Sequence, residues 1–129
     1  MSIVQEIRSS FKQGSILTRL IYINIGVFLI FRFLQLFMLL GGAASEAIVG
    51  WLHFFSVPSE PARLLQQPWT LLTYMFLHFD FLHLLFNVLY LYWFGRLFLH
   101  YIGPGPFLKT YVLGGLAGAV FYLLSYNFL

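Results

Sequence analysis

Two polar side chains stand in an apolar stretch of this chain and could do chemistry there. His83 and Asn87 lie within a run of mostly aliphatic and aromatic residues. In a helix, residues four apart share one face, here separated along the axis by ~6 Å. An imidazole N–H and a carboxamide NH₂ can both donate to a developing oxyanion, where one donor is worth ~10²–10³ in rate. Polar groups in a membrane segment usually face a protein interior or a wet cavity, so this pair suggests a functional site.

Two other interpretations of these residues stay open. In the first, His83 and Asn87 are structural and hydrogen-bond between helices, as such side chains do in membrane bundles. In the second, His78, Asp80 and His83 bind a metal ion, since imidazole and carboxylate are ordinary ligands. His78 and His83 are five residues apart, which would place them off one another's face in a helix. The chain has no Cys, and therefore no thiolate ligand and no thiol nucleophile.

The composition places these residues in a membrane protein. Hydrophobic residues make up 60% of the 129 residues and charged residues 9%, against roughly 25% charged in soluble domains. A soluble fold of this size could not cover so much apolar surface. We therefore predict an all-α polytopic membrane protein of one domain at most. The seven Lys and Arg residues are scattered, unlike the basic patch of a nucleic-acid-binding protein, so we expect no nucleic-acid partner.

Three segments are apolar and long enough to cross a bilayer, which needs ~20 residues. The long connection after the first contains several prolines together with Trp51 and Trp69, which favours a loop with a short helix in the membrane interface. A Gly-Pro-Gly-Pro turn separates the other two, because no helix continues through it. The predicted segments are a polar lead-in that could form a surface amphipathic helix (1–18), a first span (20–40), an outer interfacial loop (41–80), a second span (81–99), a turn (100–106) and a third span (107–126).

The charge distribution predicts the orientation. The lead-in and the flanks of the short turn carry most of the basic residues, whereas the long loop carries more acidic than basic residues. The positive-inside rule then places the N-terminus and the short turn in the cytoplasm and the long loop outside. In a bacterium the membrane would be the plasma membrane. The basic residues concerned are Arg8, Lys12, Arg19, Arg96 and Lys109.

Two features within the spans are assigned to packing. Arg32 lies inside the first span and must snorkel, pair or face other helices, and we expect it to hydrogen-bond loop backbone. In the third span, Gly114-x-x-x-Gly118 provides a face of small residues that permits close helix contact.

From Trp69 onward the sequence resembles the rhomboid family of intramembrane serine proteases. The resemblance lies in His78-x-x-x-x-His83-x-x-x-Asn87 at the start of a helix, in the aromatic run after it and in the long aromatic loop before it. It implies half of a six-helix bundle. It also implies that His83 and Asn87 help to stabilise the tetrahedral intermediate of peptide-bond hydrolysis within the membrane. Supporting roles are implied for His78 beneath the loop and for Trp69 in the family's Trp-Arg loop motif.

The chain departs from the family pattern in places. Thr70 stands where arginine is usual, and Leu99 where an acidic residue is common. The family's nucleophile lies in a Gly-x-Ser-Gly motif on the fourth helix and its base is a histidine on the sixth. Neither occurs in this sequence. A serine needs a positioned base to attack an amide, so we expect the N-terminal part of a protease that is inactive alone.

The resemblance implies transmembrane protein substrates, the lipid bilayer and the missing C-terminal helices as partners, and no metal or organic cofactor. A second hypothesis, from a different class, is a non-catalytic rhomboid-like protein that binds transmembrane helices in trafficking or quality control. Whether the longer protein continues into Gly-x-Ser-Gly and a late-helix histidine would distinguish the two.

Overall fold

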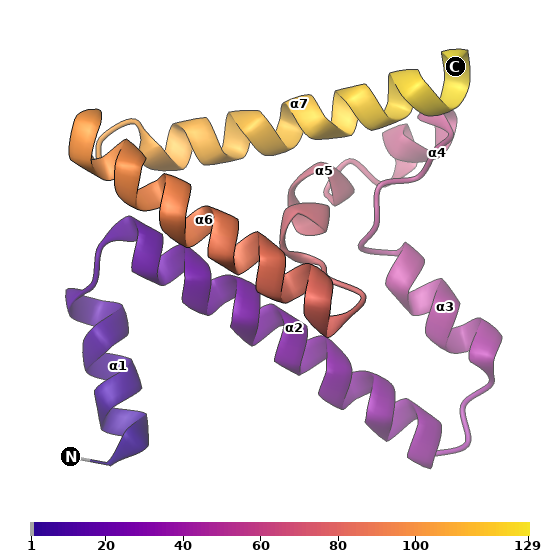
Figure 1. Ribbon diagram of the computed structural model, residues 1–129. Helices are drawn as coiled ribbons and strands as arrows, with labels where there is room; N and C mark the ends of the chain where they lie inside the picture. Colours follow the sequence, from indigo (N-terminus) through magenta and orange to yellow (C-terminus); the bar gives the residue numbers. More distant parts are fainter. Residues whose placement is uncertain (1) are drawn as a thin grey trace.

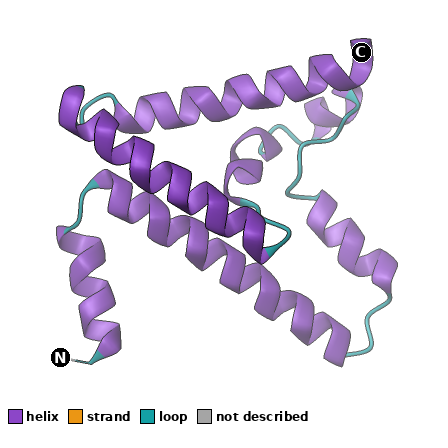
Figure 2. Ribbon diagram, viewed as in Figure 1, coloured by secondary structure: helices purple, strands orange, loops and turns teal. Residues whose placement is uncertain are grey.

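The regular elements of the protein are helices throughout residues 2–129, the part that the computed structural model describes (Figures 1 and 2). Three of them, α2, α6 and α7, are long and apolar enough to cross a membrane. The chain is therefore an all-α polytopic membrane protein, which confirms the fold class predicted from composition. The elements are α1 (Ile3–Gln13), α2 (Ile16–Leu40), α3 (Ser45–His53), α4 (Pro61–Gln66), α5 (Thr70–Thr73), the 3-10 turn η1 (Tyr74–Phe76), α6 (Phe81–Tyr101) and α7 (Phe107–Phe128).

The ends of the long helices follow local capping signals. Helix α2 begins four residues before the predicted span, because Ser15 caps it and its Oγ accepts the Thr18 N–H at 3.3 Å. Helix α6 begins after Asp80, which caps its first turn. It continues to Tyr101 rather than to residue 99, and Gly103 then takes a φ of 96°, a left-handed conformation that favours glycine. Helix α7 likewise ends two residues beyond the predicted third span.

The three long helices meet at one end of the molecule, which we call the closed end. Helices α2 and α6 lie side by side, whereas α7 starts beside the end of α6 and then diverges from it (Figure 1). The buried core lies where the three meet and consists of Leu17, Leu20 and Phe107. Gly95 of α6 lies against this core, and a Cβ added there would stand 2.6 Å from Leu17 Cδ1. A glycine therefore permits the close approach of α6 to α2 at this point.

The last part of the long loop lies between α6 and α7 where these helices diverge (Figure 1). Tyr74 donates a hydrogen bond to the Gly115 carbonyl of α7. Met75 packs so closely on Gly115 that an added Cβ would lie 2.5 Å from its terminal methyl. Thr70, at the start of α5, is completely buried, and its hydroxyl donates to the Gln67 carbonyl at 2.7 Å. The loop is thus a packed structural element and supports the separation of α6 from α7.

An aromatic cluster attaches the earlier part of the loop to α2. The Phe31 ring of α2 lies 4.7 Å from Trp51 and 5.1 Å from Phe55, centroid to centroid. Aromatic pairs at such distances stabilise by packing as well as by burial. The cluster holds α3 next to the C-terminal half of α2.

One packing prediction stays a prediction and another requires correction. The glycine face of α7 meets the loop through Gly115 and Gly118, while a Cβ at Gly114 would meet nothing within 4 Å, so the close helix contact expected at Gly114 is not tested among the described residues. Arg32 forms no hydrogen bond with loop backbone among the described residues. Its guanidinium donates instead to Gln35 Oε1 of the same helix at 3.3 Å and lies 5.2 Å from the centre of the Phe28 ring. The sequence analysis did not predict that Arg32 contacts Gln35 and Phe28 of its own helix.

Candidate functional site

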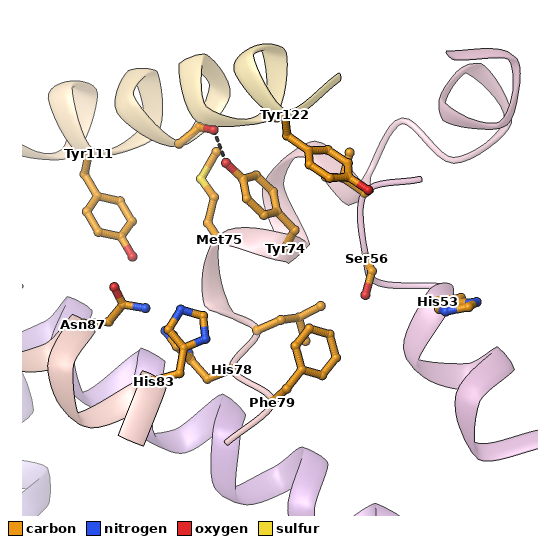
Figure 3. A pocket seen from close by; sticks show the side chains of 14 residues that line it. His53, Ser56, Tyr74, Met75, His78, Phe79, His83, Asn87, Tyr111 and Tyr122 are labelled. Carbon is orange, nitrogen blue, oxygen red and sulfur yellow. Dashed lines mark hydrogen bonds between the residues drawn. The ribbon is translucent and has the colours of Figure 1, made fainter. Parts of the chain in front are cut away.

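A cavity of about 690 Å³ lies between α6, α7 and the end of the long loop, and we call it the α6–α7 cavity (Figure 3). Apolar and aromatic side chains contribute much of its wall. Polar groups reach it from three sides: α6, α7 and the loop. Such a cavity, with a few convergent polar groups, is the usual form of a ligand site. The polar side chains that line it include Tyr74, His78, His83, Asn87, Tyr111 and Tyr122.

The two predicted donors, His83 and Asn87, both line this cavity from α6 (Figure 3). They lie one turn apart near the start of the helix, as their spacing predicts. Both residues are exposed, and among the described residues neither side chain hydrogen-bonds to another helix. The interhelix hydrogen bonds that a structural role of His83 and Asn87 would require are therefore not present among the described residues. Their polar groups are available to a ligand in the cavity.

His78 lies beside His83, although their spacing of five residues predicted different faces of a helix. Their ring centroids are 5.1 Å apart, with the rings inclined at 68°. The prediction that the two rings lie on different faces of one helix was wrong, because α6 begins only at Phe81 and His78 lies in the loop before it. Among the described residues, the buried Nδ1 of His78 has no hydrogen-bond partner. Burial, and secondly the neighbouring His83, lower the pKa of His78 from its usual 6.5.

The metal interpretation would require a third ligand near the two histidines. Asp80 Oδ1 accepts the backbone N–H of His83 at 2.7 Å, so this carboxylate acts as the cap of α6. Within residues 2–129, no group of three His, Cys, Asp or Glu side chains could hold a metal ion. The histidine pair therefore lacks the ligand set that this interpretation needs.

Trp69 acts on the site from a distance, by anchoring the loop. Its Nε1–H donates to the Phe54 carbonyl at 2.8 Å, and its ring lies 4.9 Å from the Phe54 ring. One turn later, the Thr73 hydroxyl donates to the Phe55 carbonyl at 2.7 Å. These bonds fix α5 to the end of α3. Because η1 and His78 follow α5 directly, the same bonds position the loop side of the cavity.

Sequence reasoning missed a polar contact between α2 and α7 at the wall of the cavity. Asn24, only 4% exposed, donates from Nδ2 to the Leu20 carbonyl at 2.8 Å and to the Tyr111 hydroxyl at 3.2 Å. The sequence identifies Asn24 only as a polar residue in an apolar span. No periodicity could have paired two residues that are 87 positions apart.

One serine, Ser56, also lines the cavity, close in sequence to His53 (Figure 3). Its hydroxyl donates to the Leu52 carbonyl at 2.9 Å. Among the described residues, no hydrogen bond joins the Ser56 and His53 side chains. A serine bonded to the backbone of the preceding turn has a structural role, and a nucleophile would need a base within hydrogen-bond reach.

Comparison with known proteins places the second half of the chain in a known family of domains. Residues 65–128 match the family model described as "Rhomboid domain". Over 60 residues the chain is 40% identical to "RHOMBOID-like protein 12, mitochondrial" of Arabidopsis thaliana. That match covers 46% of this chain and 18% of the relative, so the chain corresponds to a small part of that protein. No solved structure matches the chain.

Proposed function

Because the chain belongs to the rhomboid family, we propose that it forms the oxyanion-stabilising part of an intramembrane serine protease. The reaction is hydrolysis of a peptide bond in or near the transmembrane helix of a substrate protein. One observation carries the proposal: His83 and Asn87 line the α6–α7 cavity from one helix, and neither side chain is engaged by another helix among the described residues.

The proposed chemistry follows from the charge that develops during attack on an amide. The carbonyl oxygen becomes an oxyanion, and donors that are already in place stabilise it without reorganisation. The imidazole of His83 and the carboxamide of Asn87 supply such donors from adjacent turns. Apolar surroundings in the membrane would strengthen these hydrogen bonds, because charges interact more strongly at a low dielectric constant. The His78 ring, packed beside His83, would restrict the orientation of the His83 imidazole.

In this proposal the nucleophile and the base come from residues outside the printed sequence. Gly-x-Ser-Gly does not occur in it, and the cavity serine, Ser56, is bonded to the Leu52 carbonyl. Helices that carry the missing groups would pack where α6 and α7 diverge, next to the cavity. The 129 residues alone would therefore be inactive, and the partners are the C-terminal helices of the same fold, the bilayer and transmembrane substrates.

The orientation in the membrane is part of the proposal. Five of the seven basic residues belong to α1, to the start of α2 or to the two helix ends that flank the turn at Gly103. The positive-inside rule puts that end in the cytoplasm and the loop 41–80 outside. Residues His83 and Asn87, in the first two turns of α6, then lie in the outer half of the membrane.

Fluorophosphonate labelling of membranes from the native source tests the protease proposal. The probe reacts with activated serines, and peptides of the labelled band identify the protein. A labelled band well above 15.0 kDa that yields peptides of this sequence is the expected result. A full-length protein with peptides of this sequence and no labelling, beside a labelled control protease, would contradict an activated serine.

A non-catalytic rhomboid-like protein that binds transmembrane helices is the second candidate. The observation that favours it is Thr70, which is completely buried and bonded to the Gln67 carbonyl at the position where the family usually has arginine. An unlabelled protein of 15.0 kDa in the same experiment would favour this candidate and would leave His83 and Asn87 with a structural role.

A further inference from the structure

Helix α1 has an apolar face that is largely exposed toward its N-terminal end. Ile3, Val4 and Ile7 are 76%, 67% and 48% exposed, and Phe11 continues the row one turn later. These residues follow the spacing of one helical face. The helix is also well formed in itself, because Ser2 and Gln5 make a reciprocal capping box at its start. A stable helix with this pattern needs an apolar environment along one side.

Contacts with α2 determine which way this face is directed. Arg19 of α2 donates to the Phe11 carbonyl at 3.0 Å, and its guanidinium lies 5.9 Å from the centre of the Phe11 ring. The Tyr22 hydroxyl donates to Ser10 Oγ at 3.1 Å. Ser10 and Phe11 therefore face α2. Residues four apart share a helical face. Ile7 therefore lies on the same face as Phe11, on the side of α1 that is next to α2.

The connection to α2 sets the depth of α1 relative to the membrane. Only Gly14 and Ser15 separate α1 from α2, which is long and apolar enough to span a bilayer. The connection is tight, because a Cβ at Gly14 would lie 2.5 Å from the Ser10 carbonyl oxygen. Helix α1 is therefore held next to the N-terminal end of the spanning helix α2, with its apolar face on the side on which α2 runs.

The charges around α1 complement an anionic surface. Arg8 and Lys12 occupy the flank of α1 beside the apolar face, and Glu6 is the acidic residue of the helix. Arg96 and Lys109, on α6 and α7, belong to the same closed end of the molecule. Basic side chains next to a bilayer surface attract anionic phospholipid headgroups, and long Lys and Arg side chains reach them while their stems stay in the apolar region.

We propose that α1 lies in the interface of the leaflet at the closed end, with Ile3, Val4 and Ile7 among the acyl chains and Arg8 and Lys12 on anionic phospholipid headgroups. An amphipathic helix with a basic flank binds a membrane surface in this way. The anchor would hold the N-terminal end of α2 at the surface. It goes beyond the oxyanion role of His83 and Asn87 and does not depend on it.

Site-directed spin labelling of the full chain in lipid vesicles tests this proposal. The chain has no Cys, so Ile7→Cys and Ser9→Cys each introduce one labelling site, and the two positions lie on opposite faces of α1. In vesicles of phosphatidylcholine with phosphatidylglycerol, the label at position 7 should collide mainly with dissolved oxygen. The label at position 9 should collide mainly with a water-soluble nickel chelate. This reversal between two positions of one helix is the expected result.

Other occupants of the apolar face give different results. If both labels collide mainly with the nickel chelate, α1 lies in water and the proposal is wrong. A label at position 7 that is shielded from both reagents would show that protein, such as a second copy of the chain, covers the face, which would also overturn the proposal.

A second pair of variants tests the role of charge without touching the apolar face. Arg8→Gln with Lys12→Gln, in the Ile7→Cys background, should reduce oxygen collision at position 7 in vesicles that contain phosphatidylglycerol. In pure phosphatidylcholine the same substitutions should have little effect. An equal effect in both lipids would contradict a headgroup contact with anionic phospholipid.

Discussion

The closed end of the molecule and the cavity end are built in different ways. At the closed end, Leu17, Leu20 and Phe107 form a buried core, and Gly95 allows α6 to approach α2. At the cavity end, α6 and α7 diverge, part of the loop lies between them, and polar side chains such as His83 and Asn87 are exposed. Close packing stabilises the first region, whereas the second has polar groups available for a ligand or a further helix.

This difference suggests a division of roles along the bundle. Residues of the buried core at the closed end should affect mainly the free energy of unfolding, because their side chains pack against one another, away from the cavity. Residues at the cavity end should affect mainly activity in the longer protease that we propose. Substitutions at the two ends therefore test the comparison directly.

The largest expected effect is that of Asn87→Ala on turnover in the proposed protease. Loss of one oxyanion donor should lower kcat by about ten- to a thousandfold, with little change in the yield of folded protein. Asn87→Asp is the matched variant, because it keeps the size of the side chain and removes the NH₂ donor. Turnover that survives Asn87→Asp, or a loss of folded protein on Asn87→Ala, would support a structural role instead.

At the closed end, Gly95→Val should destabilise the fold by about 1–3 kcal/mol, because a Cβ at this position already overlaps Leu17. Gly114→Val is the control, since a Cβ there meets nothing within 4 Å. Unfolding of the full chain in detergent, followed by circular dichroism, measures both. Equal destabilisation by the two variants would mean that the contact with Leu17 does not limit the size of residue 95.

Tyr111→Phe should have a smaller effect, because it removes only the hydroxyl that accepts a hydrogen bond from Asn24. Polar bonds between membrane helices contribute about 0.6 kcal/mol on average. Tyr126→Phe, on the same helix and exposed, should leave the free energy of unfolding unchanged. The same denaturation experiment compares the two, and a loss with Tyr126→Phe that matches or exceeds the loss with Tyr111→Phe would count against the Asn24 bond.

The smallest expected effect is a dependence of stability on pH that arises from His78. Burial lowers the pKa of this imidazole in the folded chain, so below pH 6.5 the unfolded chain binds the proton more readily. The free energy of unfolding should therefore decrease as the pH falls below 6.5. Asp80 and His83 lie beside this imidazole, so the test is the difference between the pH profiles of the wild type and His78→Gln. No difference in the pH profile would contradict the burial argument.

Much of the site could be predicted from local sequence. Spacing alone placed His83 and Asn87 on one face of a helix, and the structure has both lining the same cavity. The approach of His78 to His83 could not be predicted in this way, because it depends on where α6 begins and on how the loop enters it. The cap formed by Asp80 determines where α6 begins, whereas the sequence analysis considered Asp80 only as a metal ligand. The Asn24–Tyr111 bond could not be predicted either, because it depends on how α7 packs against α2.

By itself the sequence determined the membrane class, the three spanning helices and the orientation of the polar pair on its helix. Hydropathy and helical periodicity are local properties, and a chain with so much apolar surface has few other ways to satisfy its backbone. The tertiary structure alone decided that α6 and α7 diverge, that Tyr74 and Met75 pack on Gly115, and that a cavity forms beside His83 and Asn87. These contacts join residues far apart in the chain, and they depend on close packing of particular side chains, which periodicity does not describe.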